Sequence, residues 1–284
     1  MRRRFADRAV TALAWLAGAT ACLVLGGLVA AVLERGLPAL SPAFLVEPTR
    51  DAGAAGGVLW QLVGTLLLGT TALVFCLPLA TGLALAGGVY LPGGAARRRL
   101  RLALYVWNGI PSIVLGIAGM LVFASLLGWG KSWLAGGLVL GWMMLPTVTL
   151  ARLARIEAIA PRRLEAAAAL GLPRGQIVRS VVLPASRGGL YTGALLGVAR
   201  ALGETAPILF TAAVFAGATL PQGVRESPVL ALPYHIYVLA QDSFEPAAME
   251  RLWGAAAVLL ALVLAASLLA LPARLRAEGE ARGA

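Results

Sequence analysis

The sequence has few charged side chains and few residues that could bind a metal ion. Only 13% of its 284 residues are charged, and it contains one histidine, His235, and two cysteines, Cys22 and Cys76. The cysteines have no metal-ligand spacing and the histidine has no neighbouring ligand residue, so we expect no metal site. The sequence also lacks paired carboxylates and a nucleophile with a nearby base. We therefore predict no catalytic residues and a protein that is not itself an enzyme.

Apolar residues dominate the chain instead. They make up 60% of it and give a mean hydropathy of +0.84, which is typical of integral membrane proteins. Crossing a bilayer as a helix takes about 20 predominantly apolar residues. We predict an all-α, polytopic membrane protein with six transmembrane helices. The predicted spans are 9–33, 58–90, 102–127, 133–150, 188–216 and 252–271.

The basic residues are distributed unevenly between the segments that join these spans. Alternate segments, beginning with the N-terminus, carry 18 Lys and Arg residues, and the other segments carry five. Because cytoplasmic loops are rich in Lys and Arg, this bias places both termini and the long loop 152–187 in the cytoplasm. The net charge of +11 thus reflects membrane topology rather than nucleic-acid binding. We predict a basic N-terminus (1–8), a transmembrane domain (9–271) and a charged cytoplasmic tail (272–284).

The fifth predicted span contains two charged residues, Arg200 and Glu204. A charge at the bilayer centre costs about 2.5 to 3.5 kcal/mol, so such residues usually face a bundle interior and mark a transport path. The span is expected to be one helix, in which small and polar residues share a face and Pro207 frees the carbonyl of Gly203 next to Glu204. An inert Arg–Glu pair four residues apart is the alternative interpretation. The predicted transport path comprises Arg200, Gly203, Glu204, Thr205 and Pro207.

The loop 152–187 is predicted to form two short helices that protrude from the membrane. The first runs over 162–170 and ends at Gly171 in a left-handed conformation. The second begins after Pro173, runs over 174–183 and ends at Pro184. A DNA-binding helix-turn-helix has similar features, but a position between membrane spans argues against it. The Gly130-Lys131-Ser132 run is no nucleotide site, because Ser125 stands where a P-loop needs glycine.

The spacing within this loop resembles the EAA loop of ABC importer permeases. Glu165, Ala166 and Ala167 are followed at the family's spacing by Gly171 and then by Leu183 and Pro184. In that family the loop docks on a separate ATPase subunit, which the resemblance implies for residues 165–172 here. No cofactor is expected on this chain, since the partner ATPase would bind the ATP. The residues implied in ATPase coupling are Glu165, Ala166, Ala167, Gly171, Leu183 and Pro184.

Residues 196–212, LGVARALGETAPILFTA, resemble the phosphate ABC importer permeases of the PstA type. Segments 56–66, 110–116 and 231–237 are similar to the same family, so the resemblance covers roughly residues 56–271. It implies a phosphate importer of the bacterial inner membrane. The implied partners are a PstC-type permease, two PstB-type ATPase subunits and a PstS-type phosphate-binding protein.

Three alternative functions remain open at the level of sequence. A permease for sulfate, molybdate or phosphonate is the nearest, because an Arg-x-x-Gly-Glu core also resembles sulfate and molybdate permeases. A passive channel or ion-coupled carrier should not need the EAA loop. A membrane-embedded enzyme would need a catalytic constellation that the sequence lacks.

Overall fold

The computed structural model describes the chain except residues 1, 92, 160, 243–244 and 283–284. It is a helical bundle with one two-stranded antiparallel hairpin, so the all-α prediction is confirmed. The bundle helices are α1 (Arg2–Gly36), α3 (Leu59–Leu85), α4 (Ala95–Asn108), α5 (Ser112–Gly119), α6 (Trp133–Glu157), α10 (Arg187–Leu202), α11 (Ala206–Thr211) and α13 (Pro246–Arg282).

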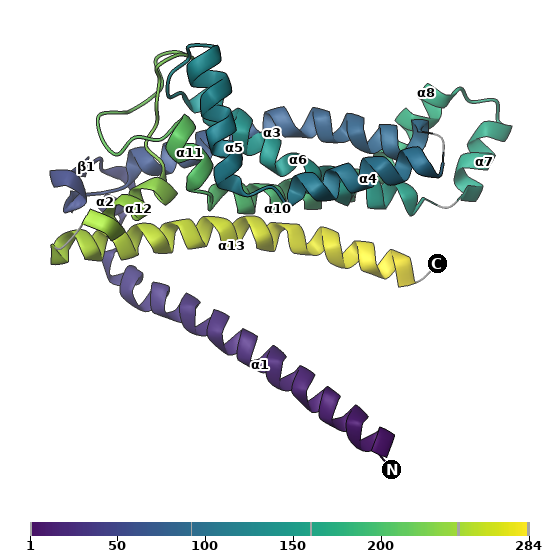
Figure 1. The fold of residues 1–284 in the computed structure, drawn as a ribbon, viewed down its shortest axis with the longest axis horizontal. Helices are drawn as coiled ribbons and strands as arrows, with labels where there is room; N and C mark the ends of the chain where they lie inside the picture. The colour runs from purple at the N-terminus through teal and green to yellow at the C-terminus, as the bar shows by residue number, and fades with distance from the viewer. Residues whose placement is uncertain (1, 92, 160, 243–244, 283–284) are drawn as a thin grey trace.

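The remaining elements are short and lie at the two ends of the bundle (Figure 1). At one end lie α2 (Pro42–Val46), β1 (Thr49–Arg50), β2 (Ala55–Gly56) and α12 (Leu232–Asp242). At the other end lie α7 (Pro161–Ala169), α8 (Arg174–Ile177) and α9 (Leu183–Ala185). π-helical turns cover Ala86–Tyr90, Met120–Leu126 and Val178–Val182, and 3-10 turns cover Leu37–Ala39 and Asp51–Gly53. The C-terminal end of α13 and the N-terminal end of α1 point toward the end that carries α7.

Helices α3, α6 and α10 form the centre of the bundle and pack through small residues. A side chain at Gly141 of α6 would lie 2.8 Å from the carbonyl oxygen of Ala72 in α3. A side chain at Gly193 of α10 would lie 3.0 Å from the Cα of Val148 in α6. Within a bilayer the hydrophobic effect drives helix association only weakly, because the lipid tails are as apolar as the helix surfaces. Close backbone packing of this kind stabilises the helix pairs instead. The buried core around these contacts includes Leu68, Ala72, Cys76, Leu140, Met144, Val148 and Ala201.

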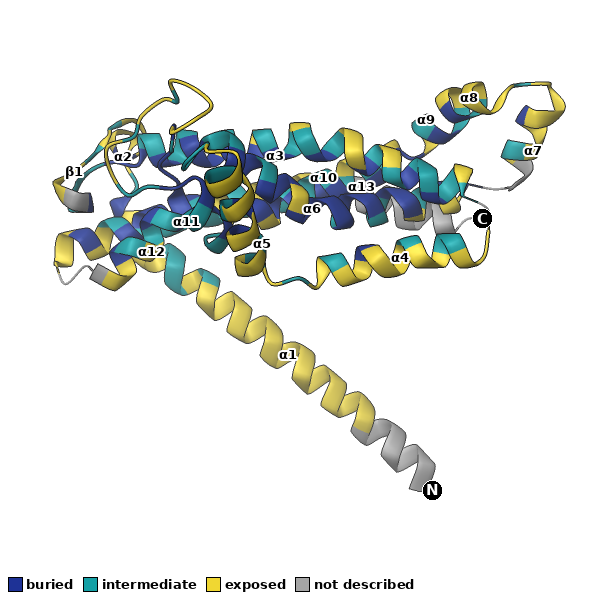
Figure 2. Ribbon diagram, turned by 45° about the horizontal axis from the view of Figure 1, so that its top comes forward, coloured by how far each residue is buried: buried dark blue, intermediate teal, exposed yellow. Residues whose placement is uncertain are grey.

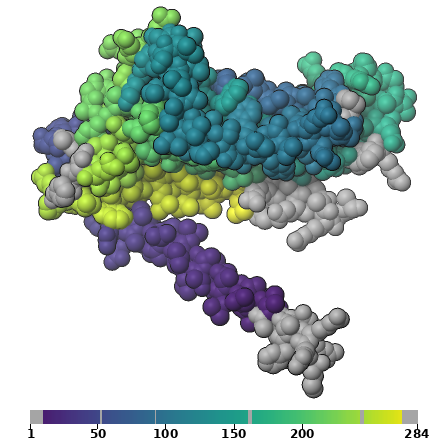
Figure 3. Space-filling view, in the orientation of Figure 1, coloured from purple at the N-terminus to yellow at the C-terminus, as the bar shows by residue number. Residues whose placement is uncertain are grey.

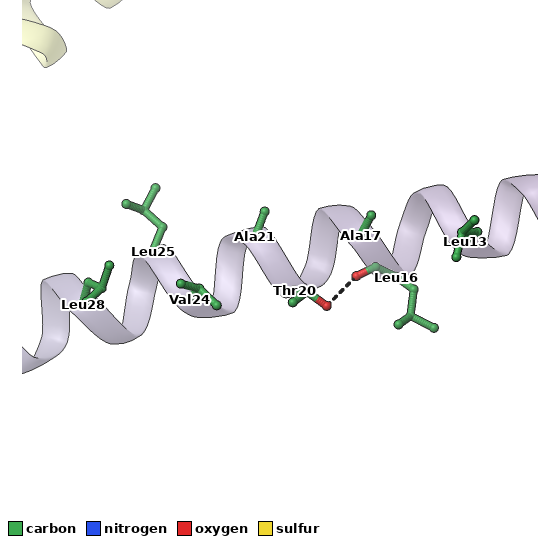
Figure 4. A pocket seen from close by; sticks show the side chains of 8 residues that line it. All are labelled: Leu13, Leu16, Ala17, Thr20, Ala21, Val24, Leu25 and Leu28. Atoms are coloured by element: carbon green, nitrogen blue, oxygen red, sulfur yellow. Dashed lines mark hydrogen bonds between the residues drawn. The ribbon is translucent and has the colours of Figure 1, made fainter.

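Helix α1 stands away from this bundle. It meets α13 only near its C-terminal end, where Gly36 approaches the backbone of Trp253, and its apolar residues are exposed over most of its length (Figures 2 and 3). The hollow drawn in Figure 4 is lined by residues of α1 alone, between Leu13 and Leu28, so no other element forms an opposite wall. It is an open apolar helix face rather than a binding pocket.

Four helical segments of the described chain are long and apolar enough to cross a membrane by themselves. They are Val10–Ala39, Leu59–Tyr90, Trp133–Glu157 and Pro246–Pro272. The predicted third span is a bent pair, α4 with α5, which turns by 89° at the break and could count as a fifth crossing. Six crossings therefore remain a prediction, as does the orientation of the termini. Helix α13 extends to Arg282, so most of the predicted tail is helical.

The prediction of one continuous helix over 188–216 is wrong. Helix α10 ends at Leu202 with Gly203 as its C-cap, and α11 begins only at Ala206. Glycine is a poor helix former, and Pro207 has no N–H to bond the carbonyl of Gly203. Pro207 instead occupies the first turn of α11, where a missing N–H costs little. Gly203 and Pro207 thus act together to break the helix that the sequence predicted as continuous.

A buried polar contact joins α3 to α12 at the end of the molecule that carries the β-hairpin. Gln61 Nε2 lies 3.4 Å from His235 Nδ1 and donates a hydrogen bond of 2.7 Å to Thr49 Oγ1. The His235 ring stacks on Phe215 and is 2% exposed. Burial lowers the pKa of His235 from 6.5 to about 4. The imidazole is therefore neutral at pH 7, and in the tautomer protonated at Nε2 its Nδ1 accepts a hydrogen bond from the Gln61 amide.

We expect this histidine to make the fold sensitive to acid. The pKa of His235 is lower in the folded state than in the unfolded state. Its contribution to the free energy of unfolding is therefore fully present above about pH 6.5 and is lost as the pH falls toward 4. The loss amounts to at most about 3 kcal/mol, at 1.36 kcal/mol for each unit of pKa. Thermal unfolding in detergent at pH 7 and pH 4.5 should show a smaller acid-induced drop for His235→Gln than for wild type. An equal drop in both proteins would contradict this assignment.

Candidate functional site

Two helix breaks lie next to each other on one side of the bundle. One separates α4 from α5 at residues 109–111, and the other separates α10 from α11 at residues 203–205. Helices α5 and α11 are in close backbone contact, because a side chain at Gly116 would lie 2.9 Å from the Cα of Pro207. In membrane proteins, broken helices are tolerated where they are buried in protein or line a cavity, and paired breaks often mark a substrate site. The breaks therefore locate the candidate site.

Four side chains meet at these breaks, and we call them the polar cluster: Asn108, Thr147, Arg200 and Glu204. Arg200 Nη1 donates to Asn108 Oδ1 at 3.2 Å, and Thr147 Oγ1 donates to the same oxygen at 3.2 Å. Arg200 Nε lies 3.6 Å from Glu204 Oε1. The cluster draws on the end of α4, the middle of α6 and the end of α10, so it holds three helices in one arrangement.

The polar cluster is open to the outside of the chain on one side. The Arg200 side chain is 39% exposed and the Glu204 side chain 20%. Asn108 Oδ1 receives two donors, and the described chain supplies no hydrogen-bond partner for the amide Nδ2. The cluster therefore presents a guanidinium and an amide donor to an anion, beside a carboxylate that competes for the guanidinium.

The predicted path residues fall into two groups. Arg200 and Glu204 are brought together as expected, although their pairing by itself fits both a transport path and an inert ion pair. The other three shape the break: Gly203 caps α10, Thr205 occupies the N-cap position of α11, and Pro207 is buried against α5. Their direct role in a path stays a prediction.

Asn108 and Thr147 were not predicted from the sequence as site residues. The sequence does contain a feature that could have identified Asn108, because this polar residue stands just before Gly109 and Pro111 in an otherwise apolar run. No such feature identifies Thr147, because a threonine hydroxyl in an apolar helix commonly donates a hydrogen bond to a carbonyl of the preceding turn and needs no partner elsewhere. Only the packing of α4 on α6 identifies it.

The protruding loop forms the predicted hairpin, with α7 as its first arm. Gly171 has φ +74 and ends α7 in the left-handed conformation, as expected. Leu172 N donates to Ala167 O at 3.3 Å and Gly171 N donates to Ala168 O at 2.9 Å. This pair of bonds is the Schellman motif, which satisfies carbonyls that a helix end would otherwise leave free.

The second arm is longer than predicted, because Pro184 does not end it. Helix α8 continues through the π turn Val178–Val182 into α9, which ends at Ala185. Pro184 stands in the first turn of α9, where a residue without an N–H is tolerated. The helical arm therefore runs to Ser186, directly before α10.

The tip and the base of the hairpin differ in exposure. At the tip, Glu165 and Ala166 are exposed, Ala167 is buried, and Leu170 is 80% exposed, a large apolar residue that sequence analysis did not single out. At the base, Val182 is buried in a cluster with Leu153 of α6, and Leu183 and Pro184 are half-buried. The hairpin is thus anchored at its base and presents an apolar tip.

The chain matches the family model "Binding-protein-dependent transport system inner membrane component" over residues 77–275. It is 31% identical over 226 residues to the Bacillus subtilis (strain 168) protein named "Probable ABC transporter permease protein YqgI", covering 78% of this chain and 74% of that protein. It is 34% identical over 243 residues to "Phosphate transport system permease protein PstA 2" of Mycobacterium bovis (strain ATCC BAA-935 / AF2122/97), covering 82% and 76%.

A third relative and a solved structure agree with these matches. The Methanocaldococcus jannaschii protein named "Probable phosphate transport system permease protein PstA" is 34% identical over 249 residues, covering 86% of this chain and 85% of that protein. A structure of the MetNI methionine ABC transporter in an inward-facing conformation superposes with a TM-score of 0.55 at 19% identity, covering 76% of this chain and 94% of that chain. At that identity the likeness concerns the fold alone.

The hairpin offers a matched pair of glycines for testing the left-handed end of α7. Neither Gly171 nor Gly175 has a neighbour within 4 Å of an added Cβ, and only Gly171 has a positive φ. Gly171→Ala should cost about 1 kcal/mol through backbone strain, whereas Gly175→Ala in α8 should be neutral or stabilising by up to about 1 kcal/mol. Limited proteolysis of the hairpin should be faster for the first variant only. Equal protection of the two would show that Gly171 is not held in this conformation.

Proposed function

The chain belongs to the family of binding-protein-dependent transport system inner membrane components, and we propose that the substrate it transports is inorganic phosphate. As a permease subunit it supplies a path across the membrane rather than a catalytic centre. The observation that carries the substrate proposal is the polar cluster, in which Arg200 is kept at a helix break with its guanidinium partly open. Relatives named as phosphate permeases, matched over most of the chain, support the same assignment.

The chemistry of the polar cluster suits a tetrahedral oxyanion. A guanidinium presents several N–H donors in a fixed fork that matches two oxygens of such an ion. The free Asn108 amide adds a neutral donor beside it. Glu204 holds Arg200 when no anion is present and competes with the anion when one arrives, which limits how long the anion is retained. A transport site needs this balance, because it must release its substrate as well as bind it.

Energy for transport comes, in this proposal, from a separate ATPase that docks on the hairpin. The exposed tip, with Glu165, Ala166 and Leu170, is the surface available for docking, and the Gly171 turn fixes its shape. The anchored base would carry movements of the tip into the bundle by way of Val182 and the half-buried Leu183 and Pro184. ATP-driven movement of the hairpin would then alternate access to the polar cluster from the two sides of the membrane.

The assembly we propose is a permease pair with two ATPase subunits and an external binding protein. A homologous permease of the PstC type would cover the open side of the polar cluster and complete the path. ATPases of the PstB type would dock at the hairpin, and a phosphate-binding protein of the PstS type would dock at the end that carries α12. Both termini would lie in the cytoplasm, consistent with the direction in which the N-terminal end of α1 and the C-terminal end of α13 point, toward the end that carries α7 (Figure 1).

Another oxyanion is the second candidate substrate. Sulfate and molybdate share the tetrahedral shape and negative charge to which Arg200 responds, so the cluster alone favours an oxyanion rather than phosphate in particular. The names of the relatives favour phosphate.

Neutralising the two charges separately tests the role of the polar cluster. Arg200→Gln should reduce uptake of labelled phosphate by about 10- to 100-fold, the factor expected for loss of a charge-assisted hydrogen bond. Glu204→Gln should lower turnover through slow release, because the anion then has no competitor for Arg200. Arg225→Gln, an exposed charge outside the cluster, is the matched control and should transport normally.

The inert-pair interpretation predicts the opposite pattern. Each single change would then destabilise the bundle by leaving one charge unpaired, and the double change would restore both stability and uptake. Uptake and thermal stability measured for both single variants and the double variant separate the two interpretations. Restored phosphate uptake in the double variant would rule out the anion site.

A further inference from the structure

A second arginine lies inside the bundle, and the path described above does not use it. Arg152 occupies the last turns of α6 and is 3% exposed. Within the described part of the chain, no carboxylate oxygen lies within 4 Å of its guanidinium, in contrast to Arg101 and Arg200, which pair with glutamates. An unpaired charge at such depth is costly, so its retention calls for an explanation.

Two hydroxyl groups from different elements accept the hydrogen bonds of this guanidinium. Arg152 Nη1 donates to Thr81 Oγ1 in α3, and Arg152 Nε donates to Ser186 Oγ at 3.3 Å. Ser186 is fully buried, and its Oγ in turn donates a hydrogen bond of 3.3 Å to the carbonyl oxygen of Leu183. The guanidinium therefore bridges α3 to the segment that joins the hairpin to α10.

Ser186 is the joint between the hairpin and the bundle. Its backbone angles, φ −93 and ψ 2, depart from helical values, so α9 ends and α10 begins there. Four residues earlier, Val182 belongs to one buried apolar cluster with Leu153 of α6 and Ala84 of α3. The hairpin base is thus joined to α6 and α3 in two ways, through this apolar cluster at Val182 and through the Arg152 bridge at Ser186.

The bridge differs from the apolar packing in how it responds to movement. The hydrophobic effect is non-directional, whereas the hydrogen bonds of a buried guanidinium are directional and lose most of their stabilisation when an acceptor moves out of hydrogen-bond distance. A joint held in this way has few discrete arrangements, which is the property that turns a small shift at one site into a defined movement at another. Ser186 and Thr81 are therefore constrained to move together.

We propose that Arg152 is a positioning residue that transmits movement of the hairpin to helix α3, by binding the joint residue Ser186 and Thr81 at the same time. The inference rests on the proposed function, since it assumes an ATPase that moves the hairpin. It assigns to Arg152 no contact with the transported anion. Its role is to make the membrane part respond when the hairpin is displaced.

Removing the bridge should uncouple the assembly without unfolding it. In the complex with the second permease, the ATPase and the binding protein, Arg152→Met should leave ATPase co-purification and basal ATP hydrolysis intact. Stimulation of hydrolysis by phosphate-loaded binding protein should fall by about tenfold or more, the factor for loss of one charge-assisted hydrogen bond. Thermal stability should be unchanged or higher, because replacing an unpaired buried charge by an apolar side chain is often neutral or stabilising.

Further variants identify the bridge as the cause. Thr81→Val combined with Ser186→Ala removes both acceptors and should lose stimulation as Arg152→Met does. Arg152→Lys keeps the charge but not the fork that spans two hydroxyls, so it should also fail to restore stimulation. Arg99→Met removes an exposed charge from α4 at the same end of the molecule and is the matched control with normal stimulation.

Two results would overturn the inference. One is normal stimulation in Arg152→Met or in Arg152→Lys. The other is a parallel loss of thermal stability, ATPase co-purification and stimulation, which would make Arg152 a structural residue only. Failure of the proposed function is recognised separately, because the wild-type complex would then show no stimulation by phosphate-loaded binding protein.

Discussion

The cost of placing polar groups inside an apolar bundle is the constraint on which the rest of this structure depends. Two arginines illustrate this cost: Arg152 is buried and is held by Thr81, and Arg200 is exposed on one side and is held by Asn108. These bonds tie α6 to α3 within the core and α10 to α4 at its edge. The breaks beside Asn108 and Gly203 expose backbone groups near Arg200. Both places where function is proposed are therefore places where the bundle holds a charged side chain.

Helix α10 connects the two proposed sites. It begins directly after the joint residue Ser186 and ends at Leu202, close to Arg200 and Glu204. Its 16 residues span about 24 Å at 1.5 Å per residue, so one rigid element runs from the hairpin base to the polar cluster. Its close packing on α6, through Gly193, keeps it straight against the core. Movement of the hairpin can reach the polar cluster along this helix, while Arg152 makes α3 follow.

Sequence reasoning was most accurate where a long apolar run or a single residue dictates the local structure. The second span was predicted at 58–90 and lies at Leu59–Tyr90, and the left-handed end of α7 at Gly171 is confirmed. It failed where several weak effects combine. Pro207 was expected to free one carbonyl within a continuous helix, but Gly203 and Pro207 together break the helix. Pro111 indicates a kink in the third span, but the size of the 89° turn between α4 and α5, and the contact of Thr147 with Asn108, depend on how helices pack, which residue spacing along one helix does not encode.

The central claim is that this permease carries inorganic phosphate through the polar cluster, and substrate competition in a reconstituted system tests it most directly. The chain would be assembled in proteoliposomes with its partner permease and ATPase, and ATP-dependent uptake of labelled phosphate would be measured with the binding protein present. Unlabelled phosphate should abolish the signal, and equal concentrations of sulfate or molybdate should leave it unchanged. ATP-dependent uptake of sulfate or molybdate in preference to phosphate would contradict the account.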